Sequence, residues 1–458
     1  MKLTVLGGGG VRAPMLAKSI ANRARALGIR RVVFMDDCEE KLRCYGALAR
    51  HVARIIDPEL QFELTSDLDD AVRDADYVIT TMRVGGDEGR VHDERIPLSM
   101  GLLGQETTGA GGFAMAMRSI PAMLRACERV RALARPGALV FNFTNPSGLV
   151  TQAAHDAGYD FVVGICDGPS EFIKEVERLL DAPGGSLDVD CMGLNHYSWY
   201  TSIRRDGREL LPEILARDDL FRDTEMRFFD PDLPRSLGVL MNGYLYYYYH
   251  PERAIANICR SEKTRGETIR DINRAMLAEL RDMDCDANFD AAMQIYLKYY
   301  YMRENSYMTI ESGGPRGSKE QPKMEMDYRR TDNDGYAGVA LNIIRAMRAG
   351  EGYRMVLSVP NGDSIPALRP EDIVEVTCTV DQRGIHPRKM AEPTGMIRAQ
   401  LLLMKHYERT AARAILNRDR ELAAQALALH PLIGSYSRAK TLADEYLKVH
   451  APYAGDWK

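Results

Sequence analysis

The stretch KLTVLGGGGVRAPMLAKSIANRARALGIRRVVFMDD, residues 2–37, decides the fold of this chain. Lys2–Leu6 is a short apolar run that predicts a β-strand, and it stops at the four glycines Gly7–Gly10. Pro14–Leu27 has the apolar spacing of a helix, and Arg31–Met35 reads as a second strand that ends in two acids. A strand, a glycine turn, a helix and an acid-terminated strand form the opening unit of a dinucleotide-binding fold.

The glycine turn is the first candidate binding feature. Without side chains it lets the backbone approach a pyrophosphate, and the N-terminus of the next helix points amide groups at the same place. A carboxylate after the second strand can hydrogen-bond to the adenosine ribose, which favours NAD over NADP; a plain tight turn would not need that acid. The residues expected to bind NAD are therefore Gly7, Gly8, Gly9, Gly10, Val11 and Asp36.

The rest of the N-terminal half repeats the alternation of strand and helix. Further strands are expected at Ala75–Thr81, Ala138–Phe143 and Phe161–Ile165, with helices over Glu39–Ile55 and Ile120–Ala134. This alternation predicts an α/β protein with an N-terminal Rossmann-like, doubly wound parallel sheet. Because the pattern then loses its regular repeat, we expect an NAD-binding Rossmann domain over residues 1–165 and a mixed α/β domain over residues 166–458.

Composition excludes several classes of protein. The chain has 458 residues, 45% of them apolar, and a formal net charge of -5 with dispersed cations, so neither nucleic acid nor an anionic membrane is an expected partner. We see no secretory signal and no uninterrupted apolar run of about 20 residues, and we expect a cytoplasmic protein. The eight cysteines form no CxxC pairs, so most should be reduced thiols in the core.

Motifs with the composition of a ligand site follow three of the expected strands. The stretch from Arg83 to Gly112 mixes glycines with charged residues, and we interpret it as a loop packed against a ligand. Asn142–Pro146 and Gly164–Pro169 end the next two strands, and Gly193–His196 comes later. A lone cysteine and a lone histidine are more often core residues than ligands, so spacing alone leaves a metal site a minority hypothesis.

Taken together, these residues resemble glycoside hydrolase family 4, over nearly the whole chain. The resemblance is carried, in order, by the motifs Gly-Gln-Glu-Thr, Asn-Phe-Thr-Asn-Pro, Gly-Ile-Cys-Asp and Gly-Leu-Asn-His. It implies glycoside hydrolysis that needs NAD and a divalent metal, a recognised exception to two-carboxylate hydrolysis. It also implies a fold related to lactate and malate dehydrogenases.

The resemblance assigns roles to individual side chains. It implies that Cys166 and His196 hold a manganese ion, although ligand softness alone would favour zinc or iron. NAD takes hydride from carbon 3 of the sugar, Tyr244 removes the proton on carbon 2, and Asp167 donates a proton to the leaving oxygen. Water then adds and the hydride returns. By the same matching, the substrate contacts are Arg90, Asn145 and Arg265, and Glu106 supports the basicity of the site.

The substrate class follows from the residues around the motifs. Asp and Pro after the motif cysteine favour a 6-phosphoglycoside, with Cys-Asp typical of phospho-α-glucosidases and the N-terminal Gly-Val-Arg-Ala-Pro closer to phospho-β-glucosidases. The alternatives are an unphosphorylated sugar, an NAD-dependent dehydrogenase with net hydride transfer, and a non-catalytic NAD-binding protein. The resemblance also implies a homodimer or homotetramer, because members of the family form such assemblies and two-fold symmetry is the commonest among soluble oligomers.

Overall fold

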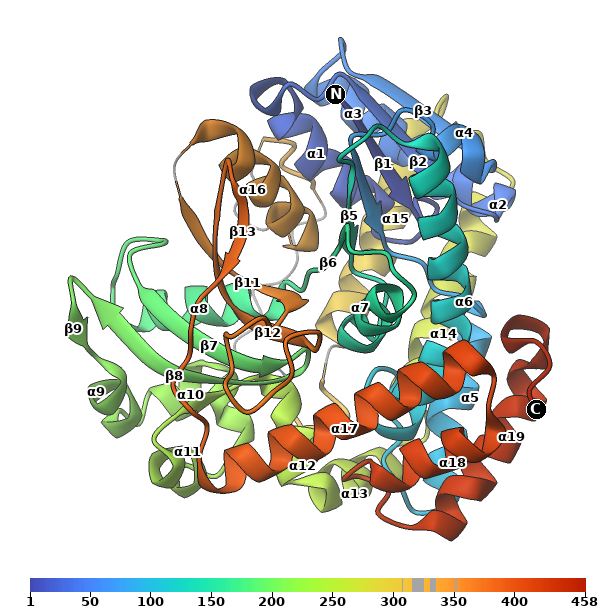
Figure 1. The fold of residues 1–458 in the computed structure, drawn as a ribbon. Coiled ribbons are helices and arrows are strands. Elements are labelled where there is room, and N and C mark those ends of the chain that lie inside the picture. Colours follow the sequence, from blue (N-terminus) through green and yellow to red (C-terminus); the bar gives the residue numbers. More distant parts are fainter. Residues whose placement is uncertain (307, 315–324, 330–334, 351) are drawn as a thin grey trace.

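The computed structural model describes residues 1–306, 308–314, 325–329, 335–350 and 352–458. Within this part of the chain, one mixed sheet of thirteen strands organises the molecule (Figure 1). The strands are β1 (Lys2–Leu6), β2 (Arg31–Met35), β3 (Gln61–Thr65), β4 (Tyr77–Thr80), β5 (Leu139–Asn142), β6 (Val162–Gly164), β7 (Asp188–Leu194), β8 (Tyr197–Arg205), β9 (Arg208–Glu209), β10 (Leu240–Met241), β11 (Tyr353–Pro360), β12 (Ile373–Asp381) and β13 (Gly384–Pro387).

The N-terminal part of the sheet is parallel, with strand order β3-β2-β1-β4-β5-β6. This is the order of a doubly wound Rossmann sheet, so the predicted fold class is confirmed. The strand β3 was not predicted, because its sequence QFELT carries only two apolar residues and its side chains stay exposed or half-exposed at the sheet edge. The inner strands β1 and β2 are apolar and largely buried, which is why they were predicted.

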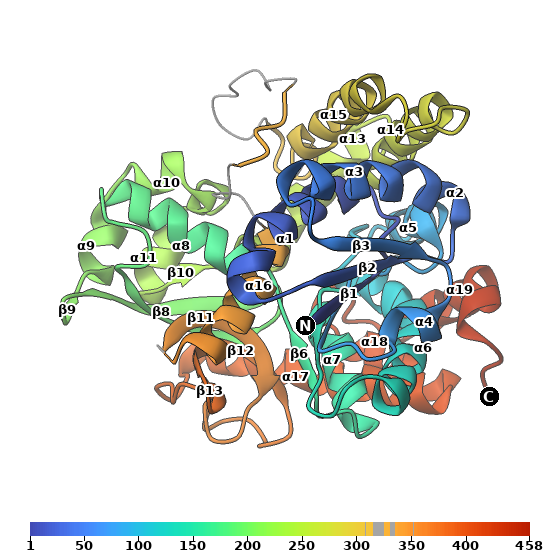
Figure 2. The same cartoon turned by 90° about the horizontal axis from the view of Figure 1, so that it is seen from above.

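Helices cover both faces of the parallel strands. In Figure 2, α1 and α3 lie on one side of β1, β2 and β3, and α4, α6 and α7 lie on the other. The expected helix over 39–55 is present as α2, a π-helical turn over Leu42–Gly46, and α3. The helices of this half are α1 (Ala13–Leu27), α2 (Glu39–Lys41), α3 (Ala47–Ile56), α4 (Leu68–Val72), α5 (Gly86–Ser99), α6 (Gly109–Leu133), α7 (Ser147–Asp156) and α8 (Gly168–Leu179).

The interpretation of residues 83–112 as a loop was wrong for most of its length. The segment forms α5 and the first turn of α6, and α6 begins at Gly109 and not near Ile120. Its glycines serve close backbone packing: a Cβ on Gly111 would lie 2.2 Å from the carbonyl oxygen of Gln105, and one on Gly112 would lie 2.7 Å from that of Thr107. Glycine is therefore compatible with a helix here because the neighbouring backbone leaves no room for a side chain.

Beyond β6 the sheet continues without a break in antiparallel order. The strand β11 pairs with β6, and β12, β7, β8 and β10 follow in that order. The division at residue 165 therefore stays a prediction about domains, since both halves share one sheet. The smaller helices here are α9 (Leu211–Ala216), α10 (Leu220–Asp223), α11 (Asp232–Leu237), α12 (Tyr246–Tyr249) and α13 (Pro251–Arg260).

Longer helices complete the fold around the sheet. The pair α14 and α15 lies beside α5 and α3, and the expected C-terminal helices α17, α18 and α19 pack together against α6 and α7 (Figures 1 and 2). The described residues include no helix with the length and apolar character needed to cross a bilayer. These helices are α14 (Arg265–Leu280), α15 (Phe289–Asn305), α16 (Gly335–Ala349), α17 (Gly395–Asn417), α18 (Arg420–Leu429) and α19 (Tyr436–Ala454).

Candidate active site

The glycine turn after β1 is pressed against the ends of two neighbouring strands. Gly7 has φ +94°, and a Cβ there would lie 2.6 Å from the carbonyl oxygen of Thr81 after β4. A Cβ on Gly8 would lie 2.5 Å from Cβ of Phe34 in β2. No side chain fits at either position, so the turn exposes only backbone at the carboxyl edge of the sheet, which is where a Rossmann fold binds pyrophosphate.

Asp36 lies beside this turn at the end of β2. Its Oδ2 accepts a hydrogen bond from the Gly9 amide at 3.1 Å, and its Oδ1 accepts one from the Cys38 amide at 3.1 Å. Burial raises the pKa of Asp36 against the effect of these amides. The turn and the acid are thus one unit, in the arrangement expected for a dinucleotide; Gly10 continues the turn and Val11 leads into α1.

Cys166 lies two residues beyond the end of β6, at the same edge of the sheet as the glycine turn. His196 occupies the two-residue turn that joins β7 to β8, with a left-handed φ of +62°. The two side chains come from different halves of the sheet, yet Sγ of Cys166 and Nε2 of His196 are 3.8 Å apart. The structure therefore brings together the pair that spacing alone could not connect.

The electrostatic environment keeps this histidine neutral. Its side chain is 8% exposed, and burial lowers the pKa of His196 to about 4, while the negative charge of Glu106 acts in the opposite direction. Burial and the charge of Asp167 raise the pKa of the Cys166 thiol. A neutral imidazole is the form that binds a metal through a ring nitrogen.

Tyr244 joins the pair from a third segment. The short strand β10 pairs with β8, and the next turn places the Tyr244 ring flat against the His196 ring, with centroids 3.8 Å apart and an interplanar angle of 1°. The Asn242 side chain accepts a hydrogen bond from the Tyr244 amide and holds the start of this turn. Of the neighbouring tyrosines, Tyr246 and Tyr247 are buried in the core, as expected.

The donor set fits a catalytic rather than a structural metal. A thiolate and an imidazole are two protein ligands, and the described residues hold no cluster of three or more His, Cys, Asp or Glu side chains suited to a metal. A metal held at Cys166 and His196 would keep most of its coordination positions for water or substrate oxygens. If oxygen ligands completed the coordination, the site would suit Mn²⁺ better than the sulfur and nitrogen atoms alone would.

Asp167 is the next residue after the cysteine and caps α8. Its side chain is 27% exposed, and Oδ2 lies 4.0 Å from a guanidinium nitrogen of Arg12, which follows the glycine turn. Arg12 also pairs with Glu304 at 3.3 Å. Burial raises the pKa of Asp167, against the charge of Arg12, so this carboxyl is biased towards its protonated form.

A chain of buried charges surrounds Glu106. Arg90 contacts Glu94 at 2.8 Å and Glu106 at 3.2 Å, and Arg83 forms a further short ion pair with Glu106. Burial acts to raise the pKa of Glu106, but the charges of Arg83 and Arg90 outweigh it and hold that pKa below the usual range. Glu106 is therefore an anion whose charge acts on His196, and Arg90 is nearly fully buried within this network. The supporting role of Glu106 stays a prediction.

The two other predicted substrate residues, Arg265 and Asn145, each form a hydrogen bond with a serine outside the Cys166–His196 pair. Arg265 begins α14, and its guanidinium donates hydrogen bonds to Ser306, including one to Oγ at 3.2 Å. Its positive charge also helps to lower the pKa of Glu106. Asn145 precedes a cis peptide bond to Pro146, and its side chain accepts a weak bond from the Ser147 amide at 3.4 Å. The roles of both residues in substrate binding stay predictions.

Several charged residues of this region were missed from the sequence. They lie close to predicted residues in space, some in helices and some in the loops between elements: Arg12, Arg83, Glu94, Arg303, Glu304 and Glu311. Glu311 is 4% exposed, and its Oε2 has no hydrogen-bond partner within the described part of the chain. Three of them had a sequence signal, because Arg83 and Glu94 lie in the stretch of glycines and charges after β4 and Arg12 lies in the Gly-Val-Arg-Ala-Pro motif.

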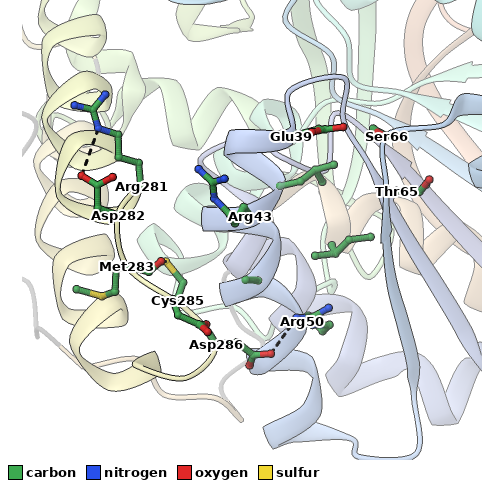
Figure 3. A pocket seen from close by; sticks show the side chains of 14 residues that line it. Glu39, Arg43, Arg50, Thr65, Ser66, Arg281, Asp282, Met283, Cys285 and Asp286 are labelled. Atoms are coloured by element: carbon green, nitrogen blue, oxygen red, sulfur yellow. Dashed lines mark hydrogen bonds and ion pairs between the residues drawn. The ribbon is translucent and has the colours of Figure 1, made fainter.

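A large surface pocket lies away from these residues. It has a volume of about 820 Å³ and is lined by the face of α3 and its π-helical turn, the end of β3, and residues 281–286 (Figure 3). Much of its charge is satisfied locally, because Arg50 pairs with Asp286 at 3.0 Å and Arg281 lies 3.9 Å from Asp282. None of the motif residues lines it, so it is not the candidate active site.

Comparison with known families gives two matches that together span most of the chain. Residues 2–182 match the model described as "Family 4 glycosyl hydrolase", and residues 191–433 match "Family 4 glycosyl hydrolase C-terminal domain". The first match contains the glycine turn and Cys166, and the second contains His196 and Tyr244. The matches thus cover both parts of the candidate site.

Individual proteins agree with the family match. A probable 6-phospho-beta-glucosidase of Bacillus subtilis is 27% identical, covering 99% of this chain and 97% of its own length. A structure of the Thermotoga maritima 6-phospho-beta-glucosidase with manganese, NAD+ and glucose-6-phosphate is 27% identical, covers 99% of both chains and superimposes with a TM-score of 0.81. A lactate dehydrogenase from a deep-sea metagenome, 12% identical with a TM-score of 0.51, shares the fold over 90% of this chain and 98% of its own length.

Proposed function

The chain belongs to glycoside hydrolase family 4, and we propose that it hydrolyses a 6-phosphoglycoside with NAD and Mn²⁺ as cofactors. The observation that carries this proposal is the cluster of Cys166, His196 and Tyr244, assembled from three distant segments at the carboxyl edge of the parallel strands. When bound, NAD would supply a hydride acceptor and the metal a Lewis acid, the two functions required by oxidation at carbon 3 followed by elimination across carbons 1 and 2.

In this proposal Tyr244 acts as the base. Its ring lies flat against that of His196, so a substrate bound at the proposed metal ligands would lie close to Tyr244. A divalent cation next to a phenol favours its charged form and lowers its pKa, which makes proton removal feasible near neutral pH. Tyr244 would take the carbon 2 proton onto its phenolate oxygen.

In the same proposal Asp167 acts as the acid. It is adjacent to the metal cysteine, and burial raises the pKa of its carboxyl, as a proton donor requires. Its proton would pass to the glycosidic oxygen as the bond to carbon 1 breaks, so that the aglycone leaves as a neutral alcohol. The carboxylate that remains could then accept a proton from the water that adds in the return half of the reaction.

The charge distribution supports a phosphorylated substrate. Arg12, Arg83 and Arg303 lie near one another, and burial together with the charge of Arg12 lowers the pKa of the Arg303 guanidinium. Glu304 offsets part of this positive charge, since it pairs with Arg12 at 3.3 Å. Partly buried cations that repel each other favour an anionic ligand, and both a sugar phosphate and the NAD pyrophosphate have that character.

The proposed function is tested by release of nitrophenol. The reduced protein would be incubated with p-nitrophenyl 6-phospho-α-glucoside, its β anomer and the two unphosphorylated glucosides, with and without NAD and Mn²⁺. Release that requires both cofactors and the 6-phosphate supports the proposal, and the preferred anomer identifies an α- or β-glucosidase. Nitrophenol release only from the unphosphorylated glucosides would contradict the proposal that the substrate carries a 6-phosphate. Steady NADH accumulation without nitrophenol release would indicate a dehydrogenase.

The oligomeric state enters the proposal only as an expectation. We expect a homodimer or homotetramer, and light scattering on the purified protein measures it. A monomer with full activity would show that the active site does not need a second subunit.

A further inference from the structure

Glu375 is a buried carboxyl directly beneath the candidate metal site. It lies on β12, is 1% exposed, and its main chain is paired with Gly193 of β7. Its Oε2 accepts a hydrogen bond from the Asn195 side chain at 2.9 Å, and its Oε1 accepts one from the Ser198 hydroxyl at 2.8 Å. Both partners belong to the β7–β8 hairpin, so one carboxyl holds both sides of the turn that carries His196.

Asn195 extends this contact to the other metal ligand. Its side chain also hydrogen-bonds to the sulfur of Cys166, in the sense that favours the thiolate. An asparagine amide has two N–H groups, so it can donate one to Glu375 and the other to the sulfur. The carboxyl therefore fixes the orientation of the amide that faces Cys166.

The turn itself needs an external anchor. His196 has φ +62°, a left-handed conformation that costs a non-glycine residue free energy and persists only where surrounding contacts enforce it. Asn195 precedes it directly, and Ser198 follows two residues later. The contacts from Glu375 are the side-chain bonds across the sheet that clamp these flanking residues.

The partners of Glu375 argue against a role in stability alone. A buried carboxyl is costly unless a cation is paired with it, and here both hydrogen-bond donors are neutral side chains. The nearby buried Lys405 is engaged by Glu408 at 2.8 Å and by the Ile373 carbonyl. An apolar residue at this position would avoid the desolvation cost, so a carboxyl here is explained by what it positions.

We propose that Glu375 is a positioning residue for the metal site, which fixes the Cys166 sulfur through Asn195 and the His196 ring through the hairpin turn. This inference rests on the proposed function, because it assumes that a divalent metal binds at Cys166 and His196. Residues that orient metal ligands typically contribute about 10- to 100-fold to metal affinity.

The test measures Mn²⁺ binding directly, by the loss of the electron paramagnetic resonance signal of free Mn²⁺ in the presence of NAD. Glu375→Leu should weaken Mn²⁺ affinity by about 10- to 100-fold, and Glu375→Gln, which keeps an acceptor for Asn195, by much less. Asp372→Asn is the matched control, because Asp372 is a 1% exposed carboxyl just before β12 that pairs with Arg409 away from the site. It should bind Mn²⁺ as the wild type does.

Two further measurements separate positioning from a general loss of structure. The activity lost in Glu375→Leu should return as the Mn²⁺ concentration rises, with NAD affinity unchanged; a misfolded protein would show neither property. Asn195→Ala, which leaves the carboxyl in place, should weaken Mn²⁺ binding to a similar extent. Wild-type affinity in Glu375→Leu would overturn this inference alone, whereas a wild-type protein that binds no Mn²⁺ would remove the proposed function and this inference together.

Discussion

The two ends of the candidate site are built in opposite ways. The dinucleotide end uses Gly7, Gly8, Gly9 and Asp36, which lie within one β-α-β unit and act through backbone packing. The metal end uses Cys166, His196 and Tyr244, which come from three separate turns and meet through side-chain contacts. Substitutions at the dinucleotide end should therefore act by disturbing backbone packing and NAD binding. Substitutions at the metal end should act on metal binding and catalysis, and each kind should affect the other end little.

The largest expected effect is at the metal end. Cys166→Ser should lower hydrolysis by about 10³-fold or more, since loss of a Lewis acid removes several kcal/mol of transition-state stabilisation. NAD binding, measured by calorimetry, should persist. Cys259→Ser, which changes an exposed cysteine, is the control and should behave as wild type. Equal loss of NAD affinity in Cys166→Ser would show that the two ends are not independent.

The next effect concerns the proposed base. Tyr244→Phe should lower kcat by about 10²- to 10⁴-fold, the range of a general base, while Mn²⁺ and NAD binding remain. Tyr249→Phe removes a hydroxyl from the same tyrosine run that bonds to Gln400, and should change kcat little. Full activity in Tyr244→Phe would show that the Tyr244 hydroxyl is not the base, even though the ring contacts His196.

The acid should show an effect that depends on the leaving group. Asp167→Asn should lower kcat/KM by about 10²-fold for a substrate with an alkyl aglycone, which needs protonation to leave. The loss should be smaller for a nitrophenyl aglycone, which leaves readily as an anion. The ratio of the two losses is the measurement, and equal losses would indicate that Asp167 binds substrate without donating a proton.

A smaller effect is expected at the dinucleotide end. Gly8→Ala places a methyl group 2.5 Å from Cβ of Phe34, and overpacking of this kind costs about 1–3 kcal/mol. NAD affinity and the thermal midpoint should both fall, with Mn²⁺ binding unchanged. Gly184→Ala, at a position with open space, is the control. Unaltered NAD affinity in Gly8→Ala would show that the turn does not hold the cofactor.

The effect that is smallest near neutral pH should lie outside both ends. Burial lowers the pKa of His430 to about 3, below its value in the unfolded chain, so the unfolded state binds the extra proton between about pH 3 and 6.5. The free energy of unfolding should therefore fall as pH falls below about 6.5, by about 1.4 kcal/mol per pH unit from this residue. His430→Asn should flatten that slope in denaturant titrations, and an unchanged slope would contradict the prediction.

The same contrast explains what the sequence could predict. The sequence predicted the glycine turn, the acid after β2 and every parallel strand except β3, because each depends on residues close together in the chain. The pairing of Cys166 with His196 came only from the family resemblance, since 30 residues that include the helix α8 and the strand β7 separate them. Glu375 could not be predicted at all, because it lies 180 residues from Asn195 and meets it only through the register of β12 on β7.

The strand order also determines when each strand can pair with its neighbour during synthesis of the chain. The six parallel strands are complete once residue 164 has been made, but β6 lacks its outer neighbour until β11 emerges about 190 residues later. At about 5–20 residues per second this takes about 10–40 seconds, during which β6 presents an open edge. An unpaired edge invites pairing with other chains, so the nascent protein should need a chaperone most before its last hundred residues leave the ribosome.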